Sequence, residues 1–185
     1  EFTTTYPKVE VALSVDDRMV DLIAEHIDVA LRVAHLEDST LVARKLCDNP
    51  RVLVASPAYL ARRGTPHVPT DLLGHDCLLY SSGARVFDEW SFLRDGVHTP
   101  LRAPGKIHIN DGMALVAAAV AGGGAMVIDR LLVGHELADG SLVQLLPDYQ
   151  LRPGQPVYAV YPARPWLAFK TATFVAFLQE RLFAD

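Results

Sequence analysis

The segment IHINDGMALVAAAVAGGGAMVI, residues 107–128, has the pattern of a β-α-β unit. A short run of β-branched residues ends at Asn110 and Asp111, two residue types that cap helices. An alanine-rich helix is predicted over 112–121, and the glycines at 122–124 end it before a second apolar strand at 125–128. The start of such a helix offers free backbone N–H groups to a polar or anionic ligand. Capping without any ligand explains the same residues.

The predicted helix carries no charge and is apolar on every side. A helix of this kind is normally buried on most faces, against a sheet or against a second subunit. A second apolar stripe lies between Met19 and Ile27. We therefore expect the protein to oligomerise, with complete burial inside one subunit as the alternative.

The bulk composition is that of a globular protein with one or two domains. The chain has 185 residues, of which 50% are hydrophobic and 21% charged, and its formal net charge is −5. The negative charge argues against binding of DNA or RNA by this chain itself, because such binding needs a concentrated basic face. Every apolar run of about 18 residues contains a charge or a helix breaker, so we expect no membrane span.

The two cysteines indicate a reducing compartment. Cys47 and Cys77 are far apart in the sequence and have apolar neighbours, which is typical of buried thiols in a cytoplasmic protein. His75, Asp76 and Cys77 are residue types that bind metal ions, but no second pair of such residues follows at a suitable spacing. We expect neither a metal nor a cofactor.

Motifs of common enzyme classes do not fit this chain. It has no Gly-x-Ser-x-Gly elbow, and His135-Glu136 is followed by Leu-Ala-Asp, which breaks the zinc-protease pattern. The glycines at 122–124 end a helix, whereas a dinucleotide-binding loop opens one. We expect no catalytic activity.

The first 33 residues suggest a further β-α-β unit. A helix end is predicted at 1–7 and a half-buried, alternating strand at 9–15. Asp16 and Asp17 then cap a helix that runs to Ile27, and a strand follows at 28–33. This order predicts that the first part of the sheet is parallel.

The other elements follow from periodicity and turn residues. We expect a short helix that begins at Ser56-Pro57 and stops at Gly64, and a further helical turn that begins at Pro69. A β-hairpin is predicted with its turn at Asp95-Gly96. Further strands are predicted at 41–46, 51–55, 77–80, 141–146 and 157–161, and further helices at 131–137 and 171–183.

Two chain crossings divide the sequence into lobes. The breaks at 48–50 and 149–156 assign residues 1–50 and 151–185 to lobe I and residues 51–150 to lobe II. This predicts an α/β protein with a ligand cleft between two lobes, lined by the residues that follow the strands. Those candidates are Ser14, Asp16, Asp17, Arg32, Tyr80, Ser81, Ser82, Asn110, Asp111 and Asp129.

Seven phrases occur in an order that resembles the effector-binding domain of LysR-type transcriptional regulators. The resemblance covers nearly the whole chain. The phrases are YPKV (6–9), DLIAEHIDVALR (21–32), LVARKL (41–46), ASPAYL (55–60) with Gly64 and Pro66, DLLGHDC (71–77), NDG (110–112) and LADGSLV (137–143).

The resemblance implies a fold similar to type 2 periplasmic binding proteins, with two Rossmann-like lobes and a small-molecule effector in the cleft. It implies a bacterial regulator that forms side-by-side dimers of this domain and tetramers when full length. In that family a winged helix-turn-helix and a linker helix precede this domain and bind the DNA, and neither is in this sequence. The chain begins near the end of the family's first helix, so we expect part of the family pocket to be missing.

Individual positions then take expected roles. Arg32 ends a strand at a position where members of the family often have a cleft-facing residue, sometimes a basic one that pairs with an effector carboxylate. The alternative is a surface arginine that forms an ion pair with Asp16 or Asp28. Ser81 and Ser82 match a ligand-binding loop, and Asn110 with Asp111 matches a helix start at the cleft. Asp129 departs from the family, which commonly has proline nearby, and its carboxylate would repel a simple anionic effector.

An alternative interpretation is a secreted solute-binding protein of the same fold. A secreted solute-binding protein would have a signal peptide upstream, whereas a regulator would have a basic helix-turn-helix segment. The coding sequence before Glu1 distinguishes the two.

Overall fold

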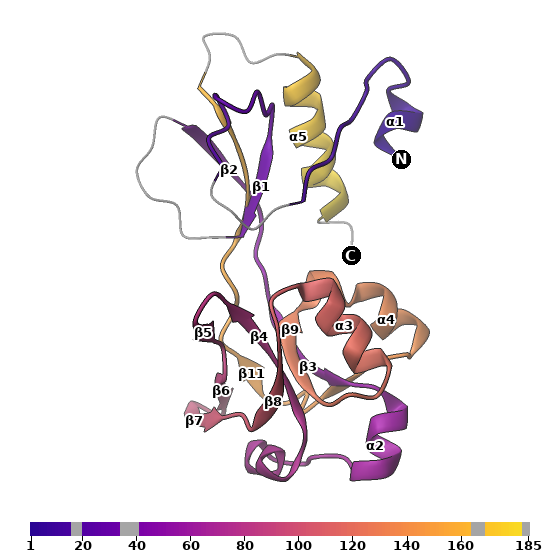
Figure 1. Cartoon of the computed structure of the whole chain (residues 1–185), viewed down its shortest axis with the longest axis vertical. Helices are drawn as coiled ribbons and strands as arrows, with labels where there is room; N and C mark the ends of the chain where they lie inside the picture. Colours follow the sequence, from indigo (N-terminus) through magenta and orange to yellow (C-terminus); the bar gives the residue numbers. More distant parts are fainter. Residues whose placement is uncertain (16–19, 34–40, 164–168, 183–185) are drawn as a thin grey trace. The chain divides into compact units, whose positions relative to one another are not determined.

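The computed structural model describes residues 1–15, 20–33, 41–163 and 169–182 (Figure 1). The chain divides into two compact units. Unit 1 contains residues 1–48 and 155–185, and unit 2 contains residues 49–154. The sequence placed the corresponding changes at 50/51 and 150/151. Each unit is described below by itself.

The centre of unit 2 contains the strands β10-β3-β9 of one sheet and the strands β4-β8 of another. β3 pairs with β10 and β9 antiparallel, and β4 pairs with β8 parallel. A parallel bridge between Cys77 and Ala125 joins β4 to the segment that leads into β9. The bounds are β3 (Arg51–Ala55), β4 (Cys77–Ser82), β8 (Gly105–Ile109), β9 (Met126–Asp129) and β10 (Val143–Leu145).

Helix α3 (Gly112–Val120) connects β8 to β9 and confirms the predicted β-α-β unit, with β4 lying between the two strands. Leu115, Val116 and Ala119 are buried in one core against the sheet. The outer side of the same helix is not covered within the described chain, because the side chains of Met113 and Val120 are 56% and 39% exposed. The helix is therefore half-buried rather than buried on most faces.

Alternation along the central strands separates two cores. Val52 and Val54 of β3 face the core beneath α3, whereas Leu53 and Ala55 face a second core. Elements on that second side include α2 (Pro57–Arg63), the 3₁₀ turn η1 (Pro69–Gly74), β6 (Glu89–Arg94), β7 (Val97–Arg102) and β11 (Gln150–Leu151). The α3 side also carries η2 (Arg130–Leu132) and α4 (Gly134–Asp139), where one helix over 131–137 was predicted.

Local turn chemistry in unit 2 follows the sequence closely. Asp95 and Gly96 both have positive φ, 51° and 78°, as a two-residue hairpin turn between β6 and β7 requires. Ser56 caps α2 through a 3.4 Å hydrogen bond from the Tyr59 backbone N–H, and Gly64 ends that helix at φ 82°. These predictions are confirmed.

Unit 1 contains a three-stranded sheet in the order β1-β12-β2, and both pairings are antiparallel. The sheet packs against α5, where Val175 lies in a core with Leu46 and Tyr161. Phe2, on the short helix α1, contacts the rings of Phe174 and Phe177 at 4.9 and 5.2 Å between centroids. The bounds are α1 (Phe2–Thr5), β1 (Ala30–Val33), β2 (Leu41–Cys47), β12 (Val157–Pro162) and α5 (Phe169–Leu182).

Three predictions for unit 1 were wrong. Residues 9–15 form no strand, and Leu13 and Val15 are more than 80% exposed, because alternation gives a strand only where a neighbour supplies hydrogen bonds. The described part of the expected helix is a single turn capped by Asp21, whose carboxylate accepts from the backbone N–H of Ile23 at 2.9 Å. The expected parallel pairing is absent among the described residues, because 9–15 forms no strand and β1 pairs antiparallel with β12.

Candidate functional site

Six of the ten predicted site residues lie along one edge of the unit 2 sheet. β8 and β4 run parallel with Tyr80 opposite Ile109, and the Cys77–Ala125 bridge sets β9 parallel to β4 on its other side. The carboxyl ends of these three strands therefore lie side by side. This carboxyl edge carries Tyr80, Ser81, Ser82, Asn110, Asp111 and Asp129.

The two serines lie in a strand rather than in the loop that was predicted. β4 continues through Ser82 because Ser81 and Ser82 pair antiparallel with Val86 and Arg85 of the short strand β5 (Arg85–Val86). Gly83, at φ 57°, permits the tight turn between them. The pairing holds the backbone of both serines in a regular hairpin. Ser81 is half-buried and Ser82 exposed.

The beginning of α3 is capped by a side chain, as the sequence indicated. The Asp111 carboxylate accepts a hydrogen bond of 2.7 Å from the backbone N–H of Ala114. This contact satisfies one of the free donors of the first turn, so Asp111 has a structural role here. Asn110, at the end of β8, is exposed.

Asp129 is compensated by a neighbouring cation. Its Oδ1 atom lies 3.1 Å from Nε of Arg51, the residue opposite it in the β3–β9 pair. The two side chains are 24% and 37% exposed. The sequence-based expectation that Asp129 repels a simple anion assumed an unpaired carboxylate. The positive charge of Arg51 offsets this repulsion. Sequence reasoning missed Arg51, because pairing of residues so far apart leaves no local signal.

Asp129 also borders a crowded corner around Gly154. The Gly154 N–H donates to the backbone carbonyl of Asn49 at 2.8 Å. Asn49 is 2% exposed, and its side-chain Oδ1 has no hydrogen-bond partner among the described residues. A Cβ atom on Gly154 would lie 2.9 Å from both Nδ2 of Asn49 and Oδ1 of Asp129. Only glycine fits this position without displacing its neighbours.

The unit 1 candidates have simpler surroundings. The Arg32 guanidinium donates to the backbone carbonyl of Val20 at 3.1 Å and is partly buried. Asp28, one of its suggested partners, forms an ion pair with Lys170 at 2.6 Å. Ser14 is exposed. Asp16 and Asp17 lie outside the described residues.

The chemistry of the described residues offers no metal centre. In the ranges that the structure describes, no group of three histidine, cysteine or acidic side chains is placed to hold a metal ion. Both cysteines are buried, as predicted. Burial raises the pKa of the Cys77 thiol to about 12, which keeps it protonated at neutral pH.

None of the helices in the described ranges combines the length and apolar character that a membrane span requires.

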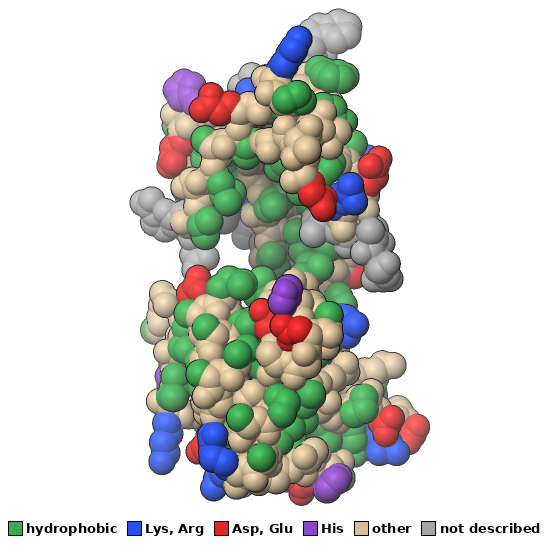
Figure 2. All heavy atoms as spheres, turned by 90° about the vertical axis from the view of Figure 1, so that its right-hand side faces the viewer, with side chains coloured by type: hydrophobic (Ala, Val, Ile, Leu, Met, Phe, Trp, Pro, Cys, Tyr) green, Lys and Arg blue, Asp and Glu red, His purple; other side chains and the backbone are tan. Residues whose placement is uncertain are grey.

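The surface of unit 2 outside this edge has two further features. Ile107 of β8 is 49% exposed, and Met113 and Val120 of α3 are exposed as well; we call these three apolar side chains the α3 face. Figure 2 looks onto the side that carries α3 and α4 and shows many hydrophobic side chains there. A separate hollow lies between the segment that precedes η1 and the loop that follows β10, and its lining shares no residue with the ten candidates.

Comparison with known proteins identifies the family. The model of the family described as "LysR substrate binding domain" matches residues 1–183. The HTH-type transcriptional regulator PtxR of Pseudomonas aeruginosa is 34% identical over 98% of this chain, which corresponds to 57% of PtxR. The HTH-type transcriptional activator AaeR of Escherichia coli is 36% identical over 95% of this chain and 56% of AaeR. The chain thus spans somewhat more than half the length of these relatives.

A solved structure agrees with this assignment. The regulatory domain of CrgA, a LysR-type transcriptional regulator from Neisseria meningitidis, matches with a TM-score of 0.86 and 30% identity, covering 98% of this chain and 88% of that one. This likeness shows the two-lobed, periplasmic-binding-protein-like α/β fold that was predicted. The chain therefore belongs to the LysR substrate-binding domain family, the effector-binding domains of LysR-type transcriptional regulators.

Proposed function

We propose that the carboxyl edge of unit 2 is the principal contact surface for the small-molecule effector of this domain. The observation that carries the proposal is the convergence of three parallel strand ends, which brings Tyr80, Ser81, Asn110 and Asp129 to one edge. Ligands of open α/β sheets bind beyond such ends. Ser14 and Arg32, together with Asp16 and Asp17 outside the described residues, are proposed as additional contacts from unit 1.

The chemistry of this edge favours a ligand rich in hydrogen-bonding groups. Ser81 and Ser82 contribute hydroxyl groups, and Asn110 contributes an amide that both donates and accepts. The Arg51–Asp129 ion pair contributes no net charge. We therefore propose a small polar effector, and a carboxylate is compatible with this edge because the Asp129 charge is compensated.

The proposed output is control of transcription in the full-length protein. The relatives that the chain matches are HTH-type transcriptional regulators, and the chain spans only 57% and 56% of their length. We propose that an N-terminal domain outside this sequence contacts the DNA, and that effector binding changes the balance between two states of the assembly. The protein would act in the cytoplasm, where bacterial DNA lies, and would not be an enzyme.

We also propose that the domain forms a homodimer and the full-length protein a tetramer. The α3 face supports this, because Ile107, Met113 and Val120 expose apolar surface and β8 pairs on one side only among the described strands. An edge strand next to an apolar helix face is suited to contact with a second copy.

The effector proposal is tested by NMR titration of the ¹⁵N-labelled domain with acetate, succinate and benzoate as probes. Binding is expected to shift the amide resonances of Ser81, Asn110 and Gly112, which lie along the carboxyl edge. The Ser81→Ala variant should weaken that binding several-fold, about the loss of one hydrogen bond, whereas Ser91→Ala on β6 should not. Probes that bind while moving only resonances away from this edge would contradict the proposal.

A further inference from the structure

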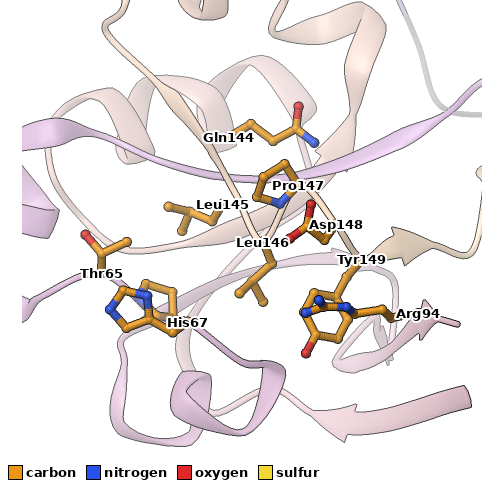
Figure 3. A pocket seen from close by; sticks show the side chains of 10 residues that line it. Thr65, His67, Arg94, Gln144, Leu145, Leu146, Pro147, Asp148 and Tyr149 are labelled. Atoms are coloured by element: carbon orange, nitrogen blue, oxygen red, sulfur yellow. The ribbon is translucent and has the colours of Figure 1, made fainter.

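A surface hollow of about 250 Å³ in unit 2 is independent of the carboxyl edge (Figure 3). Thr65 and His67, from the segment between α2 and η1, lie on one side, and Arg94 and Tyr149 lie on the other. Leu146 lies between the two sides. Segments far apart in the sequence therefore form a single concave surface.

The base of the hollow is apolar and fixed. Leu145 and Leu146 belong to the core that also contains Phe92, and both are less than 10% exposed. Leu146 has φ 48°, a conformation that a branched side chain adopts only where its surroundings impose it. The apolar base is thus held in place by the core beneath it.

The cation at the hollow is held by an aromatic ring. The guanidinium of Arg94 lies 5.3 Å from the centre of the Tyr149 ring. Tyr149 is itself positioned edge-to-face against the buried Phe92, at 6.3 Å between ring centres. The one ion pair of Arg94 with a described residue, to Asp95 at 3.6 Å, involves a carboxylate that is 89% exposed. A hydrogen bond with Tyr149 and the nearby Asp148 and Asp95 carboxylates raise the pKa of Arg94, so the guanidinium is oriented and its charge is partly neutralised by exposed groups.

The polar side chains around the hollow are exposed to solvent. Among the described residues, the Thr65 hydroxyl and the Gln144 amide form no side-chain hydrogen bond, and the Asp148 carboxylate lies near enough to Arg94 to attract its charge. They surround an apolar base together with one oriented cation. Because the lining is more polar than apolar, a ligand with charged groups and a small apolar part fits this hollow better than an apolar ligand.

The charges select the class of ligand. A simple anion would be attracted by Arg94 but repelled by Asp148, and a simple cation would be attracted by Asp148 but repelled by Arg94. A molecule with both charges on neighbouring atoms can satisfy both. We propose that this hollow binds a free α-amino acid with an apolar side chain. Its carboxylate contacts Arg94, its ammonium group contacts Asp148, and its side chain lies on Leu146 and Pro147.

The experiment uses L-leucine as the probe in an NMR titration of the whole ¹⁵N-labelled domain, with concentrations up to the order of 10 mM. Leucine is expected to shift the amide resonances of Thr65, Gln144 and Tyr149. Two comparison compounds each lack one charge: 4-methylpentanoate has no ammonium group, and 3-methylbutylamine has no carboxylate. Both are expected to bind about fivefold more weakly than leucine, the weakening that loss of one exposed charge pair gives.

Two variants test the proposed contacts of Arg94 and Asp148 with the ligand. Arg94→Gln and Asp148→Asn are expected to weaken leucine binding about fivefold each. Arg102→Gln, on the neighbouring strand β7, removes an 81% exposed arginine that pairs with Asp88 and should leave binding unchanged. The inference is overturned if leucine shifts no resonance at the hollow, if 4-methylpentanoate binds as tightly as leucine, or if Arg102→Gln has the same effect as Arg94→Gln. The carboxylate probes for the carboxyl edge report on other resonances, so either proposal can fail alone.

Discussion

The Oδ1 atom of Asp129 lies 3.1 Å from Nε of Arg51, its opposite residue across the β3–β9 pair. Replacing Arg51 with alanine leaves a carboxylate that is only 24% exposed without its partner. We expect the free energy of unfolding to fall by about 1 kcal/mol, the upper range for a partly exposed pair. Urea unfolding of Arg51→Ala, Asp129→Asn and the double variant measures the coupling. Additive effects of the two single changes would show that the pair contributes nothing.

Gly154→Ala is expected to destabilise the domain. The new Cβ would lie 2.9 Å from Asn49 Nδ2 and 3.2 Å from the Asn49 backbone carbonyl oxygen, so side chain and backbone must both move. Overpacking of this kind typically costs about 1–3 kcal/mol. Gly74→Ala is the matched control, because nothing lies within 4 Å of its Cβ position and no positive φ is required there. Equal stability of the two variants by urea unfolding would contradict the crowding.

Stability at acid pH is expected to depend on Asp71. Its carboxylate accepts backbone hydrogen bonds from His67 at 2.8 Å and Val68 at 3.1 Å, and these bonds lower its pKa below the usual value. A lowered folded-state pKa stabilises the native state above the unfolded pKa of about 3.9, and this contribution is lost as the pH falls through the folded value.

The Asp71→Asn variant tests this dependence. It should unfold at lower urea concentration than the wild type near neutral pH, and the difference should shrink as the pH falls below about 4. Asp95→Asn, at an exposed turn, is the comparison. A difference between wild type and Asp71→Asn that is constant from neutral to acid pH would contradict the assignment.

The proposed dimer is tested by a charge on the α3 face. Met113→Glu places a carboxylate at a position that is 56% exposed in the isolated chain. If a second copy covers this face, the dimer dissociation constant should rise by at least about tenfold, because a buried unpaired charge is costly. Val97→Glu, at a 65% exposed position in the hairpin, is the control. Sedimentation velocity showing a wild-type monomer, or an unchanged Met113→Glu dimer, would contradict the proposal.

The parts of the fold that the sequence predicted correctly depend on local chemistry. The Asp95-Gly96 turn needs positive φ at two adjacent residues, and the cap and stop of α2 at Ser56 and Gly64 are set within one helix. The segment 107–128 likewise contains its own cap, helix and glycine stop. Each of these signals is complete within a few residues.

The incorrect predictions depend on partners that are distant in the sequence. Alternation at 9–15 indicated a strand, but no described strand pairs with it. The parallel arrangement expected for unit 1 failed because β12, from the far end of the chain, pairs with both β1 and β2. The same reason hid Arg51, which lies 78 residues before Asp129. Strand order brings such residues together, and periodicity does not encode it.

The sequence predicted which residues lie at the strand ends, but not the contacts that these residues make. The rule that ligands bind beyond strand ends selected Tyr80, Asn110 and Asp129, and the structure places them at one edge of unit 2. The hydrogen bond from Arg32 to the Val20 carbonyl and the pairing of Ser81 with Val86 were not predictable, because both are set by tertiary structure.

The central claim, that this chain is the effector-binding part of a DNA-binding regulator, is tested most directly by reading the coding sequence upstream of Glu1. The predicted result is a segment with a helix-turn-helix pattern and basic residues, followed by a long linker helix. A signal peptide at that place would contradict the claim and would make the protein a secreted solute-binding receptor of the same fold.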